Sequence, residues 1–189
     1  MGSELQDPNE KRFDLADLGL LDGPAERDFD VATRLATHGL KATSAVFFMS
    51  DIRTSSIFIR SRSAGQIRDP LPDRFSSNDS LFAAMIDRMK TLRIDDITAH
   101  PEFSGSPEVL EGRLSSALIA PVFGPARETV GGLAVFGSKP RKWTELDVIE
   151  LKDYALILTR LIMLRASLET LKRLSAEREV LSRVTRFRN

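Results

Sequence analysis

No cysteine occurs among the 189 residues of this chain. Disulfide bonds, thiolate nucleophiles, cysteine-ligated zinc and thioether-linked chromophores are therefore excluded. No apolar run approaches the roughly 18 residues that a membrane-spanning helix needs. The first stretch, MGSELQDPNEKRFD, is polar and acidic and lacks the basic and then apolar pattern of a signal peptide. These absences favour a cytoplasmic protein with no membrane partner.

Net charge is also absent, since 27 basic residues balance 27 acidic ones. Nucleic-acid binding usually leaves a basic footprint, so nucleic acid is not an expected partner. Only two histidines occur, His38 and His100. His38 falls at a helix end, and His100 lies in a loop near Asp95, Asp96 and Glu102 without the convergent spacing of a metal site. No nucleophile elbow, P-loop or dinucleotide fingerprint is present, so we expect neither an enzyme nor a metal site.

The first half of the sequence predicts a helix, a hairpin and a second helix. Pro24 is suited to the first position of a helix that ends near His38, with Gly39 as its stop. Residues 43–51 are continuously apolar in their middle, and residues 55–63 alternate, which predicts two paired strands. In the second strand, Phe58, Arg60 and Arg62 share one face. A helix with an apolar side follows from about residue 77 to residue 90.

The second half predicts a short strand at residues 91–97 and a long, turn-rich loop at 98–112. Two apolar strands, 114–124 and 129–138, are joined by a polar connection of hairpin length. Gly131 and Gly132 indicate close backbone packing. Because short turns rather than crossover helices join successive strands, the sheet should be antiparallel, in an α+β domain with helices on the faces of the sheet.

The last element begins at a well-marked helix start. Thr144 is an N-cap, and Asp147 is its capping-box partner three residues later. No glycine or proline follows, so some 40 residues would form a rod of roughly 60 Å. Four leucines have the 3-4 spacing of a coiled-coil seam. They are Leu161, Leu164, Leu168 and Leu171.

Several stretches together resemble bacterial GAF domains, the small-molecule-sensing modules of signalling proteins. They are LGLLDGPAERDFDVATRLA, IDDITAHPEF, SALIAPV, VGGLAVFG and PRKWTELDVIELKDYA. The resemblance covers about Leu18 to Leu164. It divides the chain into an N-terminal extension at residues 1–17, a GAF-like sensor domain at 18–158 and a coiled-coil signalling or dimerisation helix at 159–189.

The resemblance implies a six-stranded antiparallel sheet with both terminal helices on one face. The middle helix and loops would cover the other face and enclose a ligand pocket. It also implies a parallel homodimer and a downstream effector, such as a histidine kinase of a two-component system or a diguanylate cyclase. Six residues are candidates for the pocket of an unknown small ligand. They are Phe58, Arg60, Phe82, Ile86, Phe103 and Arg113.

The sequence also departs from some members of the family it resembles. Members that attach bilin chromophores and members that reduce methionine sulfoxide use cysteines, and this chain has none. The Asn-Lys, Phe, Asp-Glu pattern of cyclic-nucleotide-binding members is not found. Two hypotheses stay open. One is a sensor that relays ligand or partner binding through a dimeric C-terminal helix; the other is a dimerisation module whose pocket is filled by side chains.

Overall fold

The computed structural model describes residues 18–20, 26–51, 54–64, 73–76, 81–105, 109–110 and 114–186. Its principal elements follow in chain order. They are α1 (Arg27–Gly39), β1 (Ser44–Asp51), β2 (Ser56–Ala64), β3 (Arg74–Ser76), α2 (Leu81–Arg88), β4 (Leu92–Ile94), β5 (Ser116–Phe123), β6 (Thr129–Gly137) and α4 (Glu145–Arg186). The strands form one sheet in the order β3-β2-β1-β6-β5-β4, and each neighbouring pair is antiparallel. The expected α+β architecture is confirmed.

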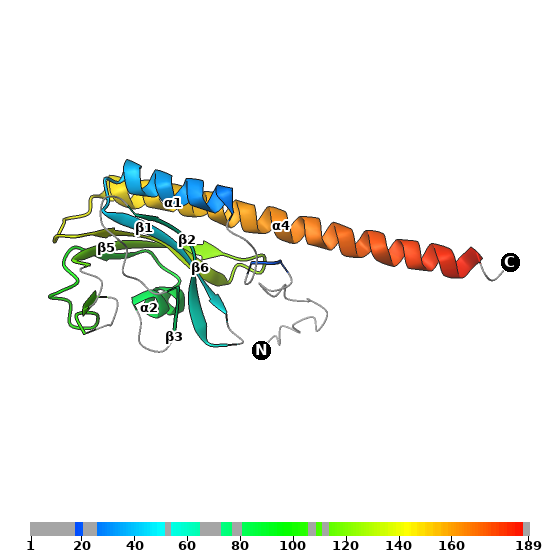
Figure 1. Cartoon of the computed structure of the whole chain (residues 1–189), viewed down its shortest axis with the longest axis horizontal. Helices are drawn as coiled ribbons and strands as arrows, with labels where there is room; N and C mark the ends of the chain where they lie inside the picture. Colours follow the sequence, from blue (N-terminus) through cyan, green and yellow to red (C-terminus); the bar gives the residue numbers. More distant parts are fainter. Residues whose placement is uncertain are drawn as a thin grey trace, which may run out of the picture.

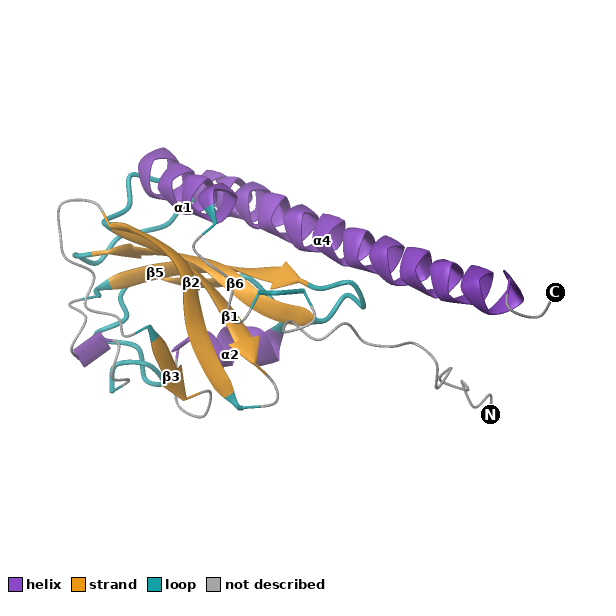
Figure 2. Cartoon of the chain, turned by 45° about the vertical axis from the view of Figure 1, so that its right-hand side comes forward, coloured by secondary structure: helices purple, strands orange, loops and turns teal. Residues whose placement is uncertain are grey.

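The helices lie on both faces of the sheet. Helices α1 and α4 run side by side over one face, and α2 covers the other (Figures 1 and 2). Each face carries its own apolar core, which we call the α4-side cluster and the α2-side cluster. Phe29, Phe47 and Leu158 belong to the first, whereas Phe48 and Phe82 belong to the second. Alternation along β1 explains the division, because Phe47 and Phe48 point to opposite faces.

The end of α1 differs from the sequence prediction. The helix includes Gly39, and the left-handed residue of the following turn is Lys41, with φ of 50°. Gly39 serves a packing purpose instead. A Cβ atom there would lie 2.2 Å from Glu150 Oε1 and 2.6 Å from the Tyr154 hydroxyl, so glycine lets α1 approach α4 closely. Pro24 lies outside the described residues.

A bulge interrupts the alternation of β2. Phe47 of β1 pairs with Ser61, whereas Phe48 pairs with Ile59, which leaves Arg60 as the extra residue. Phe58 lies opposite Met49 of the α4-side cluster, but Arg62 lies opposite Val46 of the α2-side cluster. The prediction that Phe58, Arg60 and Arg62 share one face was therefore wrong for Arg62.

The start of α4 is the one that the sequence predicts. The Thr144 N–H donates to Asp147 Oδ2 at 2.7 Å, and the Asp147 N–H donates to Thr144 Oγ1 at 3.1 Å. This reciprocal capping box is confirmed. Trp143, directly before it, is fully buried, and the Arg141 guanidinium stacks over its ring at 4.2 Å from the centroid.

Helix α4 runs for 42 residues, of which only the first half lies against the sheet. Its C-terminal half projects beyond the body (Figure 1). One stripe of the helix is buried in the α4-side cluster. It consists of Leu151, Ala155, Leu158, Ile162 and Ala166. Among the described residues, no helix combines the length and the apolar character needed to cross a membrane.

Candidate functional site

The structure divides the predicted pocket residues between the two faces of the sheet. Phe82 and Phe103 are buried in the α2-side cluster, and Ile86 packs against it. Phe58 lies in the α4-side cluster, and Arg60 contacts the α1 residues on that face. The six residues were expected around one cavity, and the bulge and alternation of β2 place Phe58 and Arg60 on the wrong face for that. Arg113 lies outside the described residues.

The described part of the α2 side is filled by aromatic side chains. The rings of Phe48 and Phe82 lie 4.6 Å apart, and Phe82 meets Phe136 edge to face at 6.0 Å. All three side chains are fully buried. Such close packing leaves no room for a ligand between these three rings.

Hydrogen bonds connect the loop after β4 to the end of α2, beside this cluster. Arg88 Nη2 donates to both carboxylate oxygens of Glu102 at 2.7 Å. The Arg88 guanidinium also lies over the Phe103 ring, which stacks on His100 with 4.6 Å between ring centroids. His100 thus has an apolar contact within the loop, through the Phe103 ring. Its Nδ1 accepts the Glu102 N–H at 3.3 Å.

Neighbouring carboxylates that sequence places near His100 have structural partners. Asp95 accepts the Trp143 N–H at 3.1 Å and so anchors the start of α4 to the end of β4. Asp96 accepts hydrogen bonds from Thr98, and the Thr98 hydroxyl in particular lowers the pKa of this carboxyl. Within the described ranges, no group of three or more histidine, aspartate or glutamate side chains is placed to hold a metal ion.

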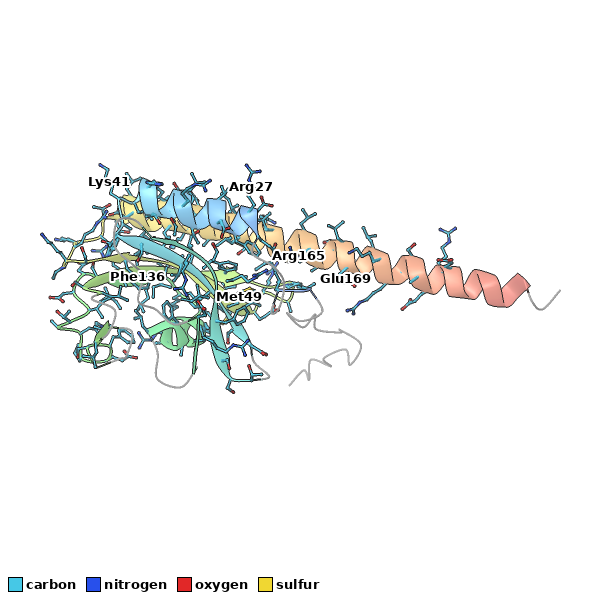
Figure 3. All side chains as sticks on the ribbon, viewed as in Figure 1. Arg27, Lys41, Met49, Phe136, Arg165 and Glu169 are labelled. Atoms are coloured by element: carbon cyan, nitrogen blue, oxygen red, sulfur yellow. The ribbon has the colours of Figure 1, made fainter. Side chains whose placement is uncertain are left out.

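An ion cluster on the opposite face joins three elements. Glu26, directly before α1, accepts hydrogen bonds from Arg60 of β2 at 2.8 Å and from Arg165 of α4 at 2.9 Å. Arg165 makes a second, shorter contact with the other oxygen of the same carboxylate. Figure 3 places Arg165 where α4 leaves the body and Glu169 farther along the rod. Sequence reasoning missed this pair, since partners 139 positions apart leave no local signal.

The side of α4 that faces away from the sheet is apolar as well. Of the four leucines expected to mediate dimerisation, Leu161 is partly buried against the α4-side cluster. The other three, Leu164, Leu168 and Leu171, are 58%, 50% and 62% exposed. Ile157, which is 47% exposed and lies four residues before Leu161, extends this surface, which we call the outer stripe. Helix α4 carries four more exposed apolar side chains. They are Leu146, Ile149, Leu156 and Leu174.

One groove in the described structure has the volume of a small molecule. It encloses about 650 Å³ between α4, β5 and the turn from α2 to β4. We call it the edge groove. Ten residues line it. They are Met89, Lys90, Thr91, Pro121, Phe123, Lys152, Asp153, Ala155, Leu156 and Thr159. No sequence pattern predicts this groove, because its walls come from three separate segments.

Comparisons with known proteins identify structures with a similar fold. No protein-family model and no curated protein matches the chain. A GAF domain of an Acinetobacter phosphoenolpyruvate-protein phosphotransferase is similar, with a TM-score of 0.59, 15% identity and coverage of 78% of this chain and 88% of that one. The PixJ GAF domain of Thermosynechococcus elongatus gives a TM-score of 0.60, 16% identity and coverage of 77% and 91%.

Similarity extends to structures that are enzymes. A type II free methionine-R-sulfoxide reductase from Thermoplasma acidophilum gives a TM-score of 0.60 at 14% identity, with coverage of 73% of this chain and 92% of that one. At identities this low, similarity shows the shared fold and no shared activity.

Proposed function

The chain has a GAF-like fold, and on that basis we propose that it is a regulatory domain which pairs with a second copy along the outer stripe of α4. The paired helices would carry the state of the domain to an effector, such as a kinase or cyclase domain. The signal would enter as a small molecule or a partner protein bound to the domain.

The outer stripe of α4 is the observation that supports this proposal most directly. Ile157, Leu161, Leu164, Leu168 and Leu171 follow one another at spacings of four, three, four and three residues. That repeat is the seam of a two-stranded coiled coil. Single exposed leucines are common on protein surfaces, but a continuous apolar stripe along one helix marks an interaction site. Burying each leucine would contribute about 1.5–3 kcal/mol.

Contacts within the domain support a relay through the same helix. Leu158 and Ile162 of α4 are buried against the sheet, while Ile157 and Leu164 face outward from the same two turns. A shift of the sheet relative to α4 would therefore move the outer stripe. A ligand or partner biases such a shift only if it binds the two arrangements with different affinity.

Sedimentation velocity tests the pairing directly. The unmodified chain should sediment as a dimer at micromolar concentration, and the double variant Leu164→Lys/Leu171→Lys as a monomer. Thr170→Lys/Glu177→Gln is the matched control, since it makes the same net charge change at two positions seven residues apart, off the seam. A monomeric parent chain, or equal dissociation of both double variants, would overturn the pairing.

A second test uses the absence of cysteine to determine whether the two helices pair in parallel. A single Leu168→Cys substitution would bring two thiols together only where the same positions meet, as in a parallel dimer. Rapid disulfide formation under mild oxidation is expected for Leu168→Cys and not for Thr170→Cys. Cross-linking of neither variant in a chain that still dimerises would argue for an antiparallel arrangement.

A dimerisation module without a ligand is the alternative, and one observation favours it. Phe82 is fully buried and Phe103 is 3% exposed, so both fill the described part of the α2 side. A module of this kind would dimerise as above but show no ligand-dependent change in α4. We do not propose methionine sulfoxide reduction, because the family resemblance assigns that chemistry to cysteines and the chain has none.

A further inference from the structure

We propose that the edge groove binds a small organic anion with an apolar body. The proposal deepens the regulatory function given above, on which its signalling meaning rests, by naming a ligand class and a site. It places the ligand at the edge of the sheet beside α4 rather than in the packed α2-side cluster.

The position of the groove follows from the unequal lengths of two strands. Strand β4 pairs only with Ala117–Ile119 of β5. Strand β5 continues to Phe123, so its last residues run past the end of β4 and leave a gap beside α4. Pro121 lies in this part of β5 and has no N–H to offer an added strand. The edge therefore suits a compact ligand better than an extended peptide.

The volume and floor of the groove suit an apolar body. About 650 Å³ falls within the range of roughly 300–1,000 Å³ that is usual for small-molecule sites. Pro121 and Phe123 are half-buried and Ala155 is buried, so they form an apolar floor. Met89 and Leu156, each 49% exposed, form apolar walls on opposite sides, one from the α2 end and one from α4.

The charges that line the groove favour an anion. Lys90 lines it from the turn after α2 and Lys152 from α4, and neither forms an ion pair within the described part of the chain. Asp153 is the only acidic residue among the lining side chains, which leaves an excess of one positive charge. A carboxylate or sulfonate would gain from the lysines, while its apolar part would cover Phe123 and Leu156.

A ligand in this groove would contact α4 directly. Lys152, Leu156 and Thr159 belong to α4, and Leu156 directly precedes Ile157 of the outer stripe. The Phe123 N–H donates to Thr159 Oγ1 at 3.2 Å, so strand and helix are already linked at the floor of the groove. Binding here would alter the contact between α4 and β5 with no need for a path through the packed α2 side.

Octanoate is a suitable probe, with 1-octanol and octylammonium as neutral and cationic counterparts. Titration of the ¹⁵N-labelled full chain should give saturable shifts at the Phe123 and Thr159 amides with octanoate. Lys90→Glu/Lys152→Glu should weaken octanoate binding at least tenfold and leave 1-octanol binding almost unchanged. Lys139→Glu/Lys172→Glu, with the same charge change at two exposed lysines that do not line the groove, should bind octanoate as the parent chain does.

Three results would overturn the proposal. They are the absence of saturable shifts at Phe123 and Thr159, equal weakening by the two lysine pairs, and octanol or octylammonium binding as tightly as octanoate. Should the Lys90 and Lys152 variant fail to fold by circular dichroism, Leu156→Glu serves instead and should abolish octanoate binding. Sedimentation of the unmodified chain separates the two hypotheses, because an intact dimer that binds no octanoate would overturn only the ligand site.

Discussion

The Glu26 carboxylate accepts hydrogen bonds from both terminal nitrogens of Arg165. These bonds connect the residue before α1 to the point where α4 leaves the domain. Ala166, the next residue along α4, is the last buried one whose side chain is described. The Glu26 side chain is 20% exposed and that of Arg165 is 35% exposed. Since Arg60 of β2 bonds to the same carboxylate, the angle at which the rod leaves is set jointly by the sheet, α1 and α4.

Removing the charge of Glu26 should weaken the ion pair that connects Glu26 to α4. We expect Glu26→Gln with Arg165→Met to give a coupling energy of about 1 kcal/mol in a double-mutant cycle of urea unfolding, because the pair is only partly shielded from water. The exposed pair of Glu169 and Lys172, separated by 3.8 Å on the rod, is the control and should couple by less than about 0.5 kcal/mol. Equal coupling in the two cycles would contradict a special role for Glu26.

Local sequence patterns predicted α1, α2, α4, every strand except the short β3, and the cap of α4, because those signals lie within a few residues of one another. Thr144 and Asp147 are three positions apart, and their reciprocal hydrogen bonds follow from that spacing. The alternation in β2 placed Phe58 and Arg60 on one face, but it gave neither the bulge that turns Arg62 to the other face nor the helices that cover each face. Phe58 was assigned to the ligand pocket for this reason, and it lies in the α4-side cluster instead.

The remaining misses arose from contacts between distant segments. Gly39 was interpreted as a helix stop by its residue type, whereas its lack of a side chain serves the approach of α1 to Glu150 and Tyr154. The bulge at Arg60 depends on its pairing with β1, which no pattern within β2 encodes. The edge groove likewise depends on how many residues of β5 extend beyond its pairing with β4, which is a property of the assembled sheet.

A second prediction concerns the backbone contact at Gly131. A Cβ atom on this residue would lie 2.1 Å from the carbonyl oxygen of Phe48, which is a backbone atom and cannot move aside alone. We expect Gly131→Ala to lower the free energy of unfolding by at least about 2 kcal/mol. Gly105→Ala is the control, because nothing lies within 4 Å of its added methyl group. Its urea midpoint should stay close to that of the parent chain.

A third prediction concerns pH and the capping box. Burial alone would raise the pKa of Asp147, but hydrogen bonds from the Thr144 N–H and hydroxyl, together with the Arg141 guanidinium, lower it below 3.8 overall. A depressed folded-state pKa means that the stabilisation is complete above 3.8 and is lost as the pH falls through the lowered value. Asp147→Asn should therefore be less stable than the parent at pH 7, by about 1 kcal/mol.

That difference should shrink as the solution is acidified below 3.8, because the parent carboxylate is then neutralised too. Urea midpoints of both proteins, measured at intervals from pH 7 downwards, provide the check. Two curves that stay parallel over the whole range would show that ionisation of Asp147 does not stabilise the start of α4.

A fourth prediction separates the two apolar surfaces of α4 with one type of substitution. Leu158 is fully buried against the sheet, while Leu164, less than two turns later, is 58% exposed. Leu158→Ala should cost about 3 kcal/mol at every protein concentration, because it leaves a cavity within one chain. Leu164→Ala should leave the free energy of unfolding of the isolated monomer almost unchanged, within about 0.5 kcal/mol.

The effect of Leu164→Ala should appear only in the dimer, as a weaker dependence of the melting temperature on protein concentration, since association stabilises the folded chain by mass action. Scanning calorimetry over a hundredfold dilution distinguishes the two cases. A concentration-independent loss of stability in Leu164→Ala would mean that the outer stripe packs within its own chain, and α4 would then lack a free surface for pairing.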